Sequence, residues 1–244
     1  MIQKIALLIV GILGFVSLSN LVQTKSIQAM ENTDHPVVLE MFTSQSCSSC
    51  PPADRVLSQL EAQNDNIIAL SCHVTYWNHL HWEDTLSKEF CSTRQRDYVR
   101  ALRSRGPYTP QIMINGKHTM VGSQGGKIVR AIENAAPIKS IGLSLDNDQL
   151  NIKLPETAGN DSYALNLVIY KDAHQQSIPS GENRGRTVTY TNPVERIVSL
   201  GTWDGTGKTM NHDISNYSDV KGYALLAQKN SKVGEIIAAG KVSN

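Results

Sequence analysis

Residues 37–52 have the sequence VVLEMFTSQSCSSCPP, and this stretch decides the fold of the first half of the chain. Residues 37–42 form a short apolar run of the length that a buried strand requires. Cys47 and Cys50 follow, and then come two prolines, which the first turn of a helix tolerates because its N–H groups have no partner there. The stretch therefore predicts a buried strand, a turn that carries two cysteines, and the start of a helix.

The spacing Cys47-Ser-Ser-Cys50 favours redox chemistry. Two cysteines separated by two residues at a helix start can close a small disulfide ring. We expect Cys47 to lie nearer the surface, where the helix dipole and free backbone N–H groups stabilise its thiolate. Cys47 is then the attacking thiol, and Cys50 is the thiol that resolves the mixed disulfide.

Strand-like and helix-like segments alternate between residues 37 and 137. Residues 111–114 and 118–121 flank Asn-Gly, the dipeptide that most strongly indicates a β-hairpin. Strands are expected at 37–42, 67–70, 111–114 and 118–121, and helices over 53–60, 84–103 and 128–132. This β-α-β-α-β-β-α order resembles that of a thioredoxin-like α/β domain, which we assign to residues 30–137.

The dipeptide Thr109-Pro110 directly precedes the third expected strand. A thioredoxin-type site has a cis-proline at this point, which packs on the disulfide and presents backbone groups to a peptide. We therefore expect a cis Thr109–Pro110 bond, an uncommon and usually functional feature. The two residues are the predicted substrate-binding residues.

After Pro137 the helical pattern stops and turn-forming dipeptides separate strand-like runs. The runs are residues 141–145, 150–154, 163–170, 187–191, 197–200, 223–228 and 235–239. Alternating Leu165, Leu167 and Ile169 suggest that their strand has one buried and one wet face. We assign residues 138–244 to an all-β, antiparallel sandwich-like domain, and we expect it to dock beside the first domain without adding catalytic residues.

The N-terminus predicts export. Lys4 precedes an apolar run over residues 5–16, and small and polar residues follow. This pattern is typical of a secretory signal peptide, assigned to residues 1–29, although an uncleaved membrane anchor fits as well. The predicted localisation is periplasmic or secreted, where disulfides persist.

The charge balance limits the partners. Lys and Arg number 23 and Asp and Glu 22, so the formal net charge of +1 gives no field that would hold nucleic acid. A membrane is a partner only if the N-terminal segment stays uncleaved. The expected partners are protein thiols or disulfides, no cofactor is expected, and the sequence leaves the oligomeric state open.

Cys72 and Cys91 are the remaining cysteines. They form either a second disulfide, which would close a short loop, or two buried free thiols. His73, His79 and His81 have no acidic ligand at a suitable spacing, so no metal site is expected. His73 differs from the other two, because it follows the second expected strand close to the cysteine pair.

Several further blocks of sequence are distinctive. They are residues 37–54, HVTYW (73–77), Trp82, RQ (94–95), YTPQ (108–111), GENRGRT (181–187) and GTWD (201–204). Together they resemble the signature of an exported bacterial family, domain of unknown function 1223, which implies a thioredoxin-like fold but no established substrate. Ser46 stands where the family has glycine, and Thr75 and Asn78 stand where acidic residues are expected, so any tuning by those acids is absent here.

Three hypotheses of function follow. The leading one is an exported thiol–disulfide oxidoreductase that acts on periplasmic or secreted proteins through Cys47 and Cys50. The second is a non-catalytic binding module in which that cysteine pair is a structural disulfide. The third is a carrier that binds a soft metal such as Cu(I) through the two thiolates. Whether the protein is an enzyme therefore depends on the reduction potential of the pair.

Overall fold

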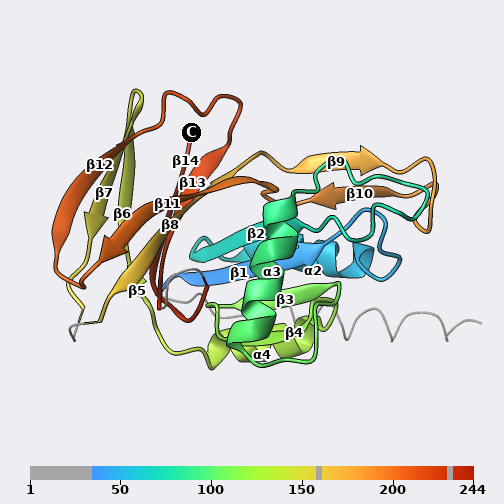
Figure 1. The fold of residues 1–244 in the computed structure, drawn as a ribbon, viewed down its shortest axis with the longest axis horizontal. Helices are drawn as coiled ribbons and strands as arrows, with labels where there is room; N and C mark the ends of the chain where they lie inside the picture. Colours follow the sequence, from blue (N-terminus) through green and yellow to red (C-terminus); the bar gives the residue numbers. More distant parts are fainter. Residues whose placement is uncertain (1–34, 158–160, 230–232) are drawn as a thin grey trace, which may run out of the picture.

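The computed structural model describes residues 35–157, 161–229 and 233–244. Segment 1–29, where the sequence predicts a signal peptide or an anchor, lies outside the described residues. In the part of the chain that is described, no helix is both long enough and apolar enough to cross a membrane. Figure 1 shows the ribbon, with the N-terminal half (residues 35–137) in blue to green and the C-terminal half (residues 138–244) in yellow to red.

One four-stranded sheet organises the N-terminal half. Its elements are β1 (Val37–Thr43), α2 (Pro51–Gln63), β2 (Ile67–His73), α3 (Glu89–Ala101), β3 (Gln111–Ile114), β4 (His118–Val121) and α4 (Gly125–Glu133). The strand order is β2-β1-β3-β4, with β1 and β2 parallel and β3 antiparallel to both of its neighbours. This order of elements is the one that the sequence predicts.

The two faces of this sheet carry different helices. Helices α2 and α4 cover one face through an apolar cluster that includes Leu39, Leu57 and Ile128. Helix α3 packs on the opposite face (Figure 1). The expected buried side of α4 is confirmed, because Ile128, Val129 and Ile132 are all buried. The loop between β1 and α2, which carries the cysteine pair, therefore starts at the end of a central strand.

Three sheets make up the C-terminal half. Its strands are β5 (Lys139–Ser140), β6 (Gly142–Asp146), β7 (Gln149–Leu154), β8 (Tyr163–Tyr170), β9 (His174–Ser177), β10 (Thr187–Tyr190), β11 (Val194–Trp203), β12 (Lys208–Asp213), β13 (Gly222–Lys229) and β14 (Ile236–Ser243). A five-stranded sheet, β11-β8-β13-β14-β5, packs against a three-stranded sheet, β12-β7-β6. The hairpin β9–β10 extends away from both and lies over the N-terminal half (Figure 1).

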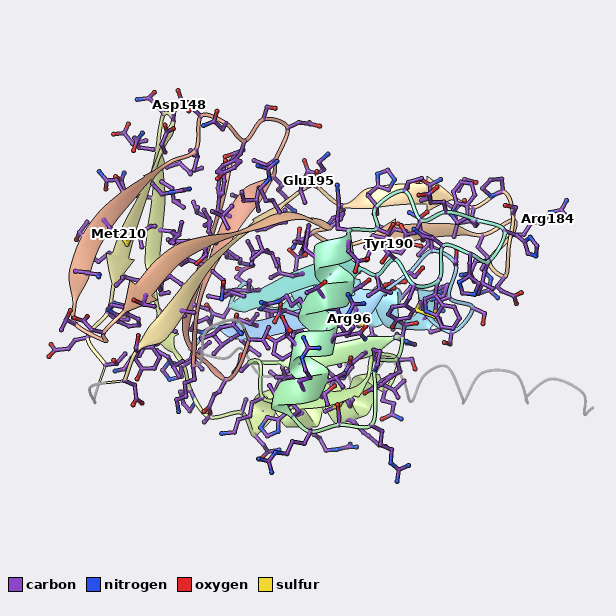
Figure 2. All side chains as sticks on the ribbon, in the orientation of Figure 1. Arg96, Asp148, Arg184, Tyr190, Glu195 and Met210 are labelled. Atoms are coloured by element: carbon purple, nitrogen blue, oxygen red, sulfur yellow. A yellow bond between two sulfur atoms is a disulfide. The ribbon has the colours of Figure 1, made fainter. Side chains whose placement is uncertain are left out.

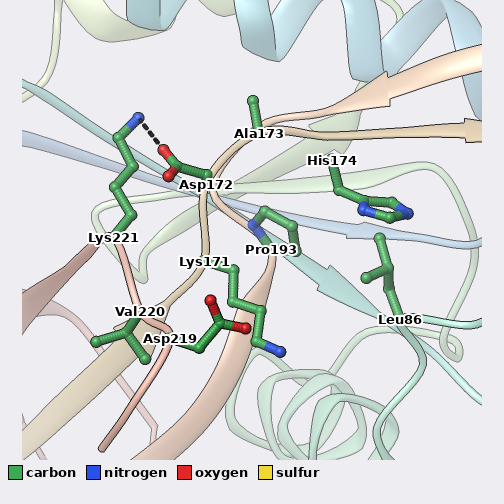
Figure 3. A pocket seen from close by; sticks show the side chains of 9 residues that line it. All are labelled: Leu86, Lys171, Asp172, Ala173, His174, Pro193, Asp219, Val220 and Lys221. Carbon is green, nitrogen blue, oxygen red and sulfur yellow. Dashed lines mark ion pairs between the residues drawn. The ribbon is translucent and has the colours of Figure 1, made fainter.

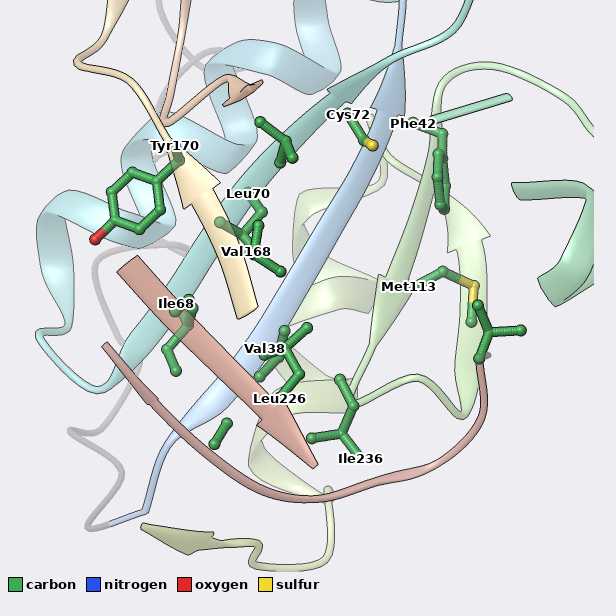
Figure 4. Packing of buried hydrophobic residues seen from close by; sticks show 14 of the residues in the cluster. Val38, Phe42, Ile68, Leu70, Cys72, Met113, Val168, Tyr170, Leu226 and Ile236 are labelled. Atoms are coloured by element: carbon green, nitrogen blue, oxygen red, sulfur yellow. The ribbon is translucent and has the colours of Figure 1, made fainter. Parts of the chain in front are cut away.

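The central strand β8 has no wet face, so the expected wet face is wrong. Leu165 and Leu167 on one side pack toward the three-stranded sheet. Val168 and Tyr170 on the other side pack onto the N-terminal sheet, in a cluster that includes Val38 (Figure 4). Because this cluster draws on both halves, the halves share one continuous hydrophobic core.

A buried polar network joins the two halves beside that core. Arg94 Nε donates to Glu40 Oε1 at 2.6 Å, and Tyr98 Oη donates to Glu40 Oε2 at 2.6 Å. Arg94 also donates to Gln228 Oε1 at 2.9 Å, and Gln228 accepts a further hydrogen bond from Asn166. Since each buried charge has a partner of opposite charge and further hydrogen bonds, the network fixes the register of the halves without an unpaired ion.

The sequence analysis does not predict the polar strands β9 and β12. Their sequences, HQQS and KTMNHD, lack alternating apolar residues, and they become strands because β10 and β7 offer pairing partners. Helix α3 begins at Glu89 rather than at the expected residue 84. Asp84 instead accepts backbone hydrogen bonds from Gln45 and Leu86, which holds its own segment in a loop.

Candidate functional site

The cysteine pair lies at the N-terminus of α2. Cys47 and Cys50 form a disulfide with a Cα–Cα distance of 5.4 Å. Cys50 is the N-cap residue of the helix and is fully buried, whereas Cys47 is 4% exposed. The backbone N–H groups of Ala53 and Asp54 donate to Cys50 O at 2.8 and 3.1 Å, so the hydrogen bonding of the first turn of α2 starts at Cys50. Cys47 is the more exposed of the two, but only narrowly.

A chain of hydrogen bonds ends on the sulfur of Cys47. The indole Nε1 of Trp77 donates to Thr109 Oγ1 at 2.8 Å, and Thr109 Oγ1 donates to Cys47 Sγ at 3.1 Å. The Thr109–Pro110 bond is cis, as the sequence predicts, and Pro110 is buried. Because a hydrogen bond to the charged form lowers a pKa, the Thr109 hydroxyl favours a thiolate at Cys47 once the disulfide is reduced.

The loop before Cys47 is tied to the segment between β2 and α3. The backbone N–H of Gln45 donates to Asp84 Oδ2 at 2.8 Å, and its side-chain Oε1 accepts from Trp82 Nε1 at 2.9 Å. The hydroxyl of Ser46 donates to Trp82 O at 2.5 Å. These contacts hold the approach to Cys47 in one conformation.

Asp54 is a buried acid one helical turn after Cys50. Burial raises the pKa of its carboxyl from 3.8 to about 7, and the imidazole of His73 opposes that rise. Both carboxyl oxygens lack a hydrogen-bond partner among the described residues, as do Thr43 Oγ1 and His73 Nε2. Residues at i and i+4 lie on one face of a helix, so Asp54 lies on the face of α2 that begins with Cys50, and the charged groups that act on its carboxyl are His73, Asp84 and Arg55.

His73 forms a second buried pair with Asp84. Its Nδ1 lies 2.7 Å from Asp84 Oδ2, and its ring meets the ring of Tyr190 edge-on at 4.6 Å between centroids. Burial alone would raise the pKa of Asp84, but His73 and the backbone N–H groups of Gln45 and Leu86 outweigh it and lower that pKa. His73 therefore lies beside the cysteine loop, as expected, and Asp84 connects the two.

The hairpin β9–β10 brings residues of the C-terminal half into the site. Asn183, in the hairpin loop, donates from Nδ2 to Gln45 O and to Cys47 O, both at 2.8 Å. Tyr190, labelled in Figure 2, lies at the end of β10 nearest the centre of the molecule. The C-terminal half thus contributes to the surroundings of the disulfide. Its docking beside the first half is expected from the sequence, but the roles of Asn183 and Tyr190 are not.

Comparison with known proteins places the chain in a family. The sequence profile for "Protein of unknown function (DUF1223)" matches residues 38–228. The chain belongs to the DUF1223 family. No curated protein matches it. The family assignment agrees with the resemblance that the sequence blocks show, and it carries no activity with it.

Two solved structures resemble this DUF1223 protein. Protein AGR_C_4864 from Agrobacterium tumefaciens, a structural genomics target, has a TM-score of 0.76 and 27% sequence identity, over 88% of this chain and 96% of that one. HBP35 of Porphyromonas gingivalis has a TM-score of 0.58 and 15% identity, over 87% of this chain and 76% of that one. The second likeness is one of fold alone.

The second disulfide of the DUF1223 chain joins Cys72 and Cys91, which is the first of the two alternatives that the sequence leaves open. Cys72 ends β2 just before His73, and Cys91 lies in the first turn of α3. Both sulfur-bearing residues are buried in the apolar cluster that the two halves share, with Phe42 and Tyr98 as neighbours in that cluster. These surroundings fit a structural bridge between a strand and a helix.

The three positions where the sequence analysis expects other residues, Ser46, Thr75 and Asn78, make local hydrogen bonds. Thr75 Oγ1 donates to Glu89 Oε2 at 2.6 Å, and Asn78 Oδ1 accepts from the backbone N–H of Asp84 at 3.3 Å. Ser46, in place of glycine, bonds to Trp82 as described above. The substituted side chains therefore support the loops around the disulfide and add no charge to them.

His79 and His81 differ from His73 in their surroundings, and one cavity lies away from the candidate site residues. His79 stacks on Trp77, and His81 is exposed. Within residues 35–157, 161–229 and 233–244, no group of three or more His, Cys, Asp or Glu side chains could hold a metal ion. A cavity of about 300 Å³ lies at the junction of the halves and is lined in part by Lys171, Asp172 and Lys221 (Figure 3). None of the candidate site residues lines it.

Sequence reasoning found Cys47, Cys50, Thr109 and Pro110, and the structure brings them together. It assigned no role to Asp54 or Asn183, although both lie in sequence blocks that resemble the family signature. An aspartate in the first turn of a helix is ordinarily a favourable partner of the helix dipole, so nothing in the sequence marks Asp54 as buried. Asn183 sits in a glycine-rich turn that is ordinary by itself, and only the long-range packing of the hairpin shows its role.

Proposed function

We propose that this DUF1223 protein is an exported thiol–disulfide oxidoreductase, with a thioredoxin-like N-terminal half and a sandwich-like C-terminal half. The observation that carries the proposal is the Cys47–Cys50 disulfide at the start of α2, with the hydroxyl of Thr109 donating to Cys47 Sγ. A cysteine so placed has the two features that activate a thiolate, a helix N-terminus and a hydrogen-bond donor.

The first step uses the reduced protein. The Cys47 thiolate attacks one sulfur of a substrate disulfide, a Cys47–substrate S–S bond forms, and the other substrate sulfur leaves as a thiolate. The N-terminus of α2 and the hydroxyl of Thr109 stabilise the attacking charge. Trp77 supports this role, because its indole N–H orients the Thr109 hydroxyl by donating to the same oxygen.

The second step needs a proton acceptor for the buried thiol of Cys50. We assign this role to Asp54, whose raised pKa lets its carboxylate accept a proton near pH 7. The Cys50 thiolate then attacks Cys47 Sγ, the Cys47–Cys50 bond forms, and the substrate sulfur leaves as a thiolate. Two electrons pass from the two protein thiols to the substrate, and the reverse sequence of steps oxidises a substrate dithiol.

The proposed substrates are proteins with thiols or disulfides in the periplasm or outside the cell. The buried Cys72–Cys91 disulfide supports that location, because structural disulfides persist in oxidising compartments. The rings of Tyr76 and Trp77 pack together next to Thr109, which donates a hydrogen bond to Cys47. These rings offer a surface for a polypeptide.

One observation favours the rival hypothesis of a binding module with a structural disulfide. Cys47 is almost as buried as Cys50, and a protein substrate must reach its sulfur. The two hypotheses differ in the stability of the disulfide, because structural disulfides have reduction potentials below about −300 mV. The potential of this pair therefore decides between them.

The test is a redox titration of the full chain in glutathione and dithiothreitol buffers, with thiol counting by mass. We expect the Cys47–Cys50 pair to titrate above about −300 mV, with Cys72 and Cys91 still bonded. Sub-stoichiometric alkylation of the reduced pair should label Cys47 before Cys50. A potential in the structural range, or preferential labelling of Cys50, would contradict the proposal. Metal analysis of the reduced protein with Cu(I) tests the carrier hypothesis.

A further inference from the structure

Asn183 joins the C-terminal half to the cysteine loop through hydrogen bonds. It is 1% exposed, and each polar atom of its amide has a partner. Nδ2 donates to Gln45 O and Cys47 O at 2.8 Å each, and Oδ1 accepts from Arg186 Nη1 at 3.0 Å. A buried amide with every hydrogen bond made has a single orientation, so the two carbonyl groups are held in one direction.

The hairpin loop is built to present this amide. Gly181 has a φ of +75°, and a Cβ there would come within 3.0 Å of Leu80 O, so only glycine fits. Ser180 Oγ donates to His81 O at 2.7 Å, which ties the loop to the same segment, residues 80–82. Beneath it, Ile178, Val188 and Tyr190 pack against Trp82 and Leu86. These contacts hold the hairpin β9–β10, and with it the side-chain amide of Asn183, in one position next to the cysteine loop.

We infer that Asn183 is a positioning residue that sets the reactivity of Cys47 from the C-terminal half of the molecule. The inference deepens the proposed function and rests on it, because Cys47 is the nucleophile of that proposal. It also assigns a purpose to the hairpin β9–β10, which makes an anchoring contact to the cysteine loop as well as to α2.

The physical reason is electrostatic. The carbonyl oxygens of Gln45 and Cys47 carry partial negative charge within two residues of the sulfur, and a thiolate is stabilised when such dipoles face elsewhere. The amide of Asn183 holds both oxygens and places two N–H donors next to them. Without it the Gln45 carbonyl can turn toward the sulfur, and the Cys47 carbonyl keeps only the hydrogen bond from the backbone N–H of Cys50 at 3.2 Å, so the loop aligns Cys47 less firmly with the N-terminus of α2.

The variants are Asn183→Ala, Asn183→Asp and Arg186→Ala, with Arg184→Ala as the matched control. Arg184 is exposed and lies at the far tip of the same hairpin (Figure 2). Asn183→Asp keeps the shape of the side chain but replaces both donors with acceptors and adds a negative charge. Arg186→Ala keeps both donors and removes only the group that orients the amide, so it tests the same role with the least disturbance.

The readout is the pH dependence of Cys47 alkylation in the full chain, with the Cys47–Cys50 pair reduced and Cys72–Cys91 intact. We expect Asn183→Ala to raise the apparent pKa of Cys47 by about one unit, which makes alkylation at pH 7 about tenfold slower. Asn183→Asp should slow it more, Arg186→Ala less, and Arg184→Ala not at all. A merely structural role would change thermal stability without moving this pKa.

The outcomes are separable from those of the proposed function. If Asn183→Ala and Arg186→Ala are folded by circular dichroism and alkylate as the wild type does, the inference is wrong. If Asn183→Ala fails to fold, Arg186→Ala and Asn183→Asp decide in the same assay. A wild-type potential in the structural range would end the oxidoreductase proposal, yet the alkylation profiles of the reduced proteins would still show whether Asn183 controls Cys47.

Discussion

The two disulfides share a Cα–Cα distance of 5.4 Å but lie in opposite surroundings. Cys72–Cys91 is embedded in the apolar cluster between the halves, where burial makes ionisation of a thiol unfavourable. Cys47–Cys50 lies at a helix N-terminus, with a hydroxyl donor on one sulfur and a buried acid one turn away. The proposed function therefore assigns chemistry to one pair and stability to the other because of their surroundings, and not because of the bond itself.

The connection between the two pairs is short. Cys72 is followed directly by His73, which pairs with Asp84, and Asp84 holds the backbone of Gln45 two residues before Cys47. The Cys72–Cys91 disulfide between β2 and α3 thus holds in place the segment to which the loop before Cys47 is hydrogen-bonded. Removing one pair should therefore affect mainly chemistry, and removing the other mainly stability.

The largest effect is expected from Cys47→Ser. This variant should lose thiol–disulfide exchange by about a thousandfold or more, because the attacking thiolate is gone. Cys50→Ser should instead trap a mixed disulfide between Cys47 and the substrate. The double variant Cys72→Ala with Cys91→Ala is the control and should keep exchange. Exchange that survives Cys47→Ser but not the double variant would reverse the assignment of the two pairs.

The next largest effect concerns stability. The double variant Cys72→Ala with Cys91→Ala should lower the free energy of unfolding by about 3 kcal/mol, since the bridge closes a loop of 19 residues. Denaturant titration of oxidised wild type and variant measures it. Selective reduction of the Cys47–Cys50 pair is the comparison and should cost less, because its loop is far shorter. Equal losses would remove the distinction between the pairs.

Asp54→Asn should stabilise the protein at high pH and impair its chemistry. The carboxyl pKa rises from 3.8 to about 7 on folding, so between those values the folded state holds a proton that the unfolded state has lost. Wild-type stability contributed by this group therefore falls as pH rises from about 4 to 7. The variant lacks this loss and should be more stable by about 4 kcal/mol at pH 8, because a pKa raised from 3.8 to about 7 corresponds to that free energy, with little difference at pH 4.

The same variant should slow the release of substrate from the mixed disulfide at pH 8, because no carboxylate remains to accept the Cys50 proton. Asp65→Asn, an exposed site at the end of the α2–β2 connection, serves as control. Unfolding curves at the two pH values and quenched-flow exchange measure the two effects. If the variant is less stable than the wild type at pH 8, the buried carboxylate of Asp54 does not destabilise the folded state, and this prediction is wrong.

The smallest effect is expected from Thr109→Val. The variant keeps the shape of the side chain and removes the donor to Cys47 Sγ, which should cost the thiolate about 1 kcal/mol, or about fivefold in alkylation rate at pH 7. Thr189→Val, on the exposed face of the hairpin, should leave the rate unchanged. A Thr109→Val protein with unaltered alkylation would show that the helix N-terminus alone activates Cys47.

The sequence by itself determined the local features of this protein. Runs of apolar residues, Asn115-Gly116 and the Cys47–Cys50 spacing each act within a few residues, so β1, the β3–β4 hairpin and the cysteine turn could be predicted. The cis bond before Pro110 was expected from resemblance to a known type of site, whereas the pairing of Cys72 with Cys91 was left open against two buried free thiols.

Tertiary structure decided everything that depends on contact between the halves. Val168 and Tyr170 look like the wet face of a strand until the N-terminal sheet covers them, and Asp54 looks like a favourable helix-start acid until burial raises its pKa. Asn183 becomes part of the site only because a hairpin more than a hundred residues away folds over Cys47. Burial and long-range hydrogen bonds depend on which surfaces pack against each other, and the residues within one segment do not determine which other segment will cover it.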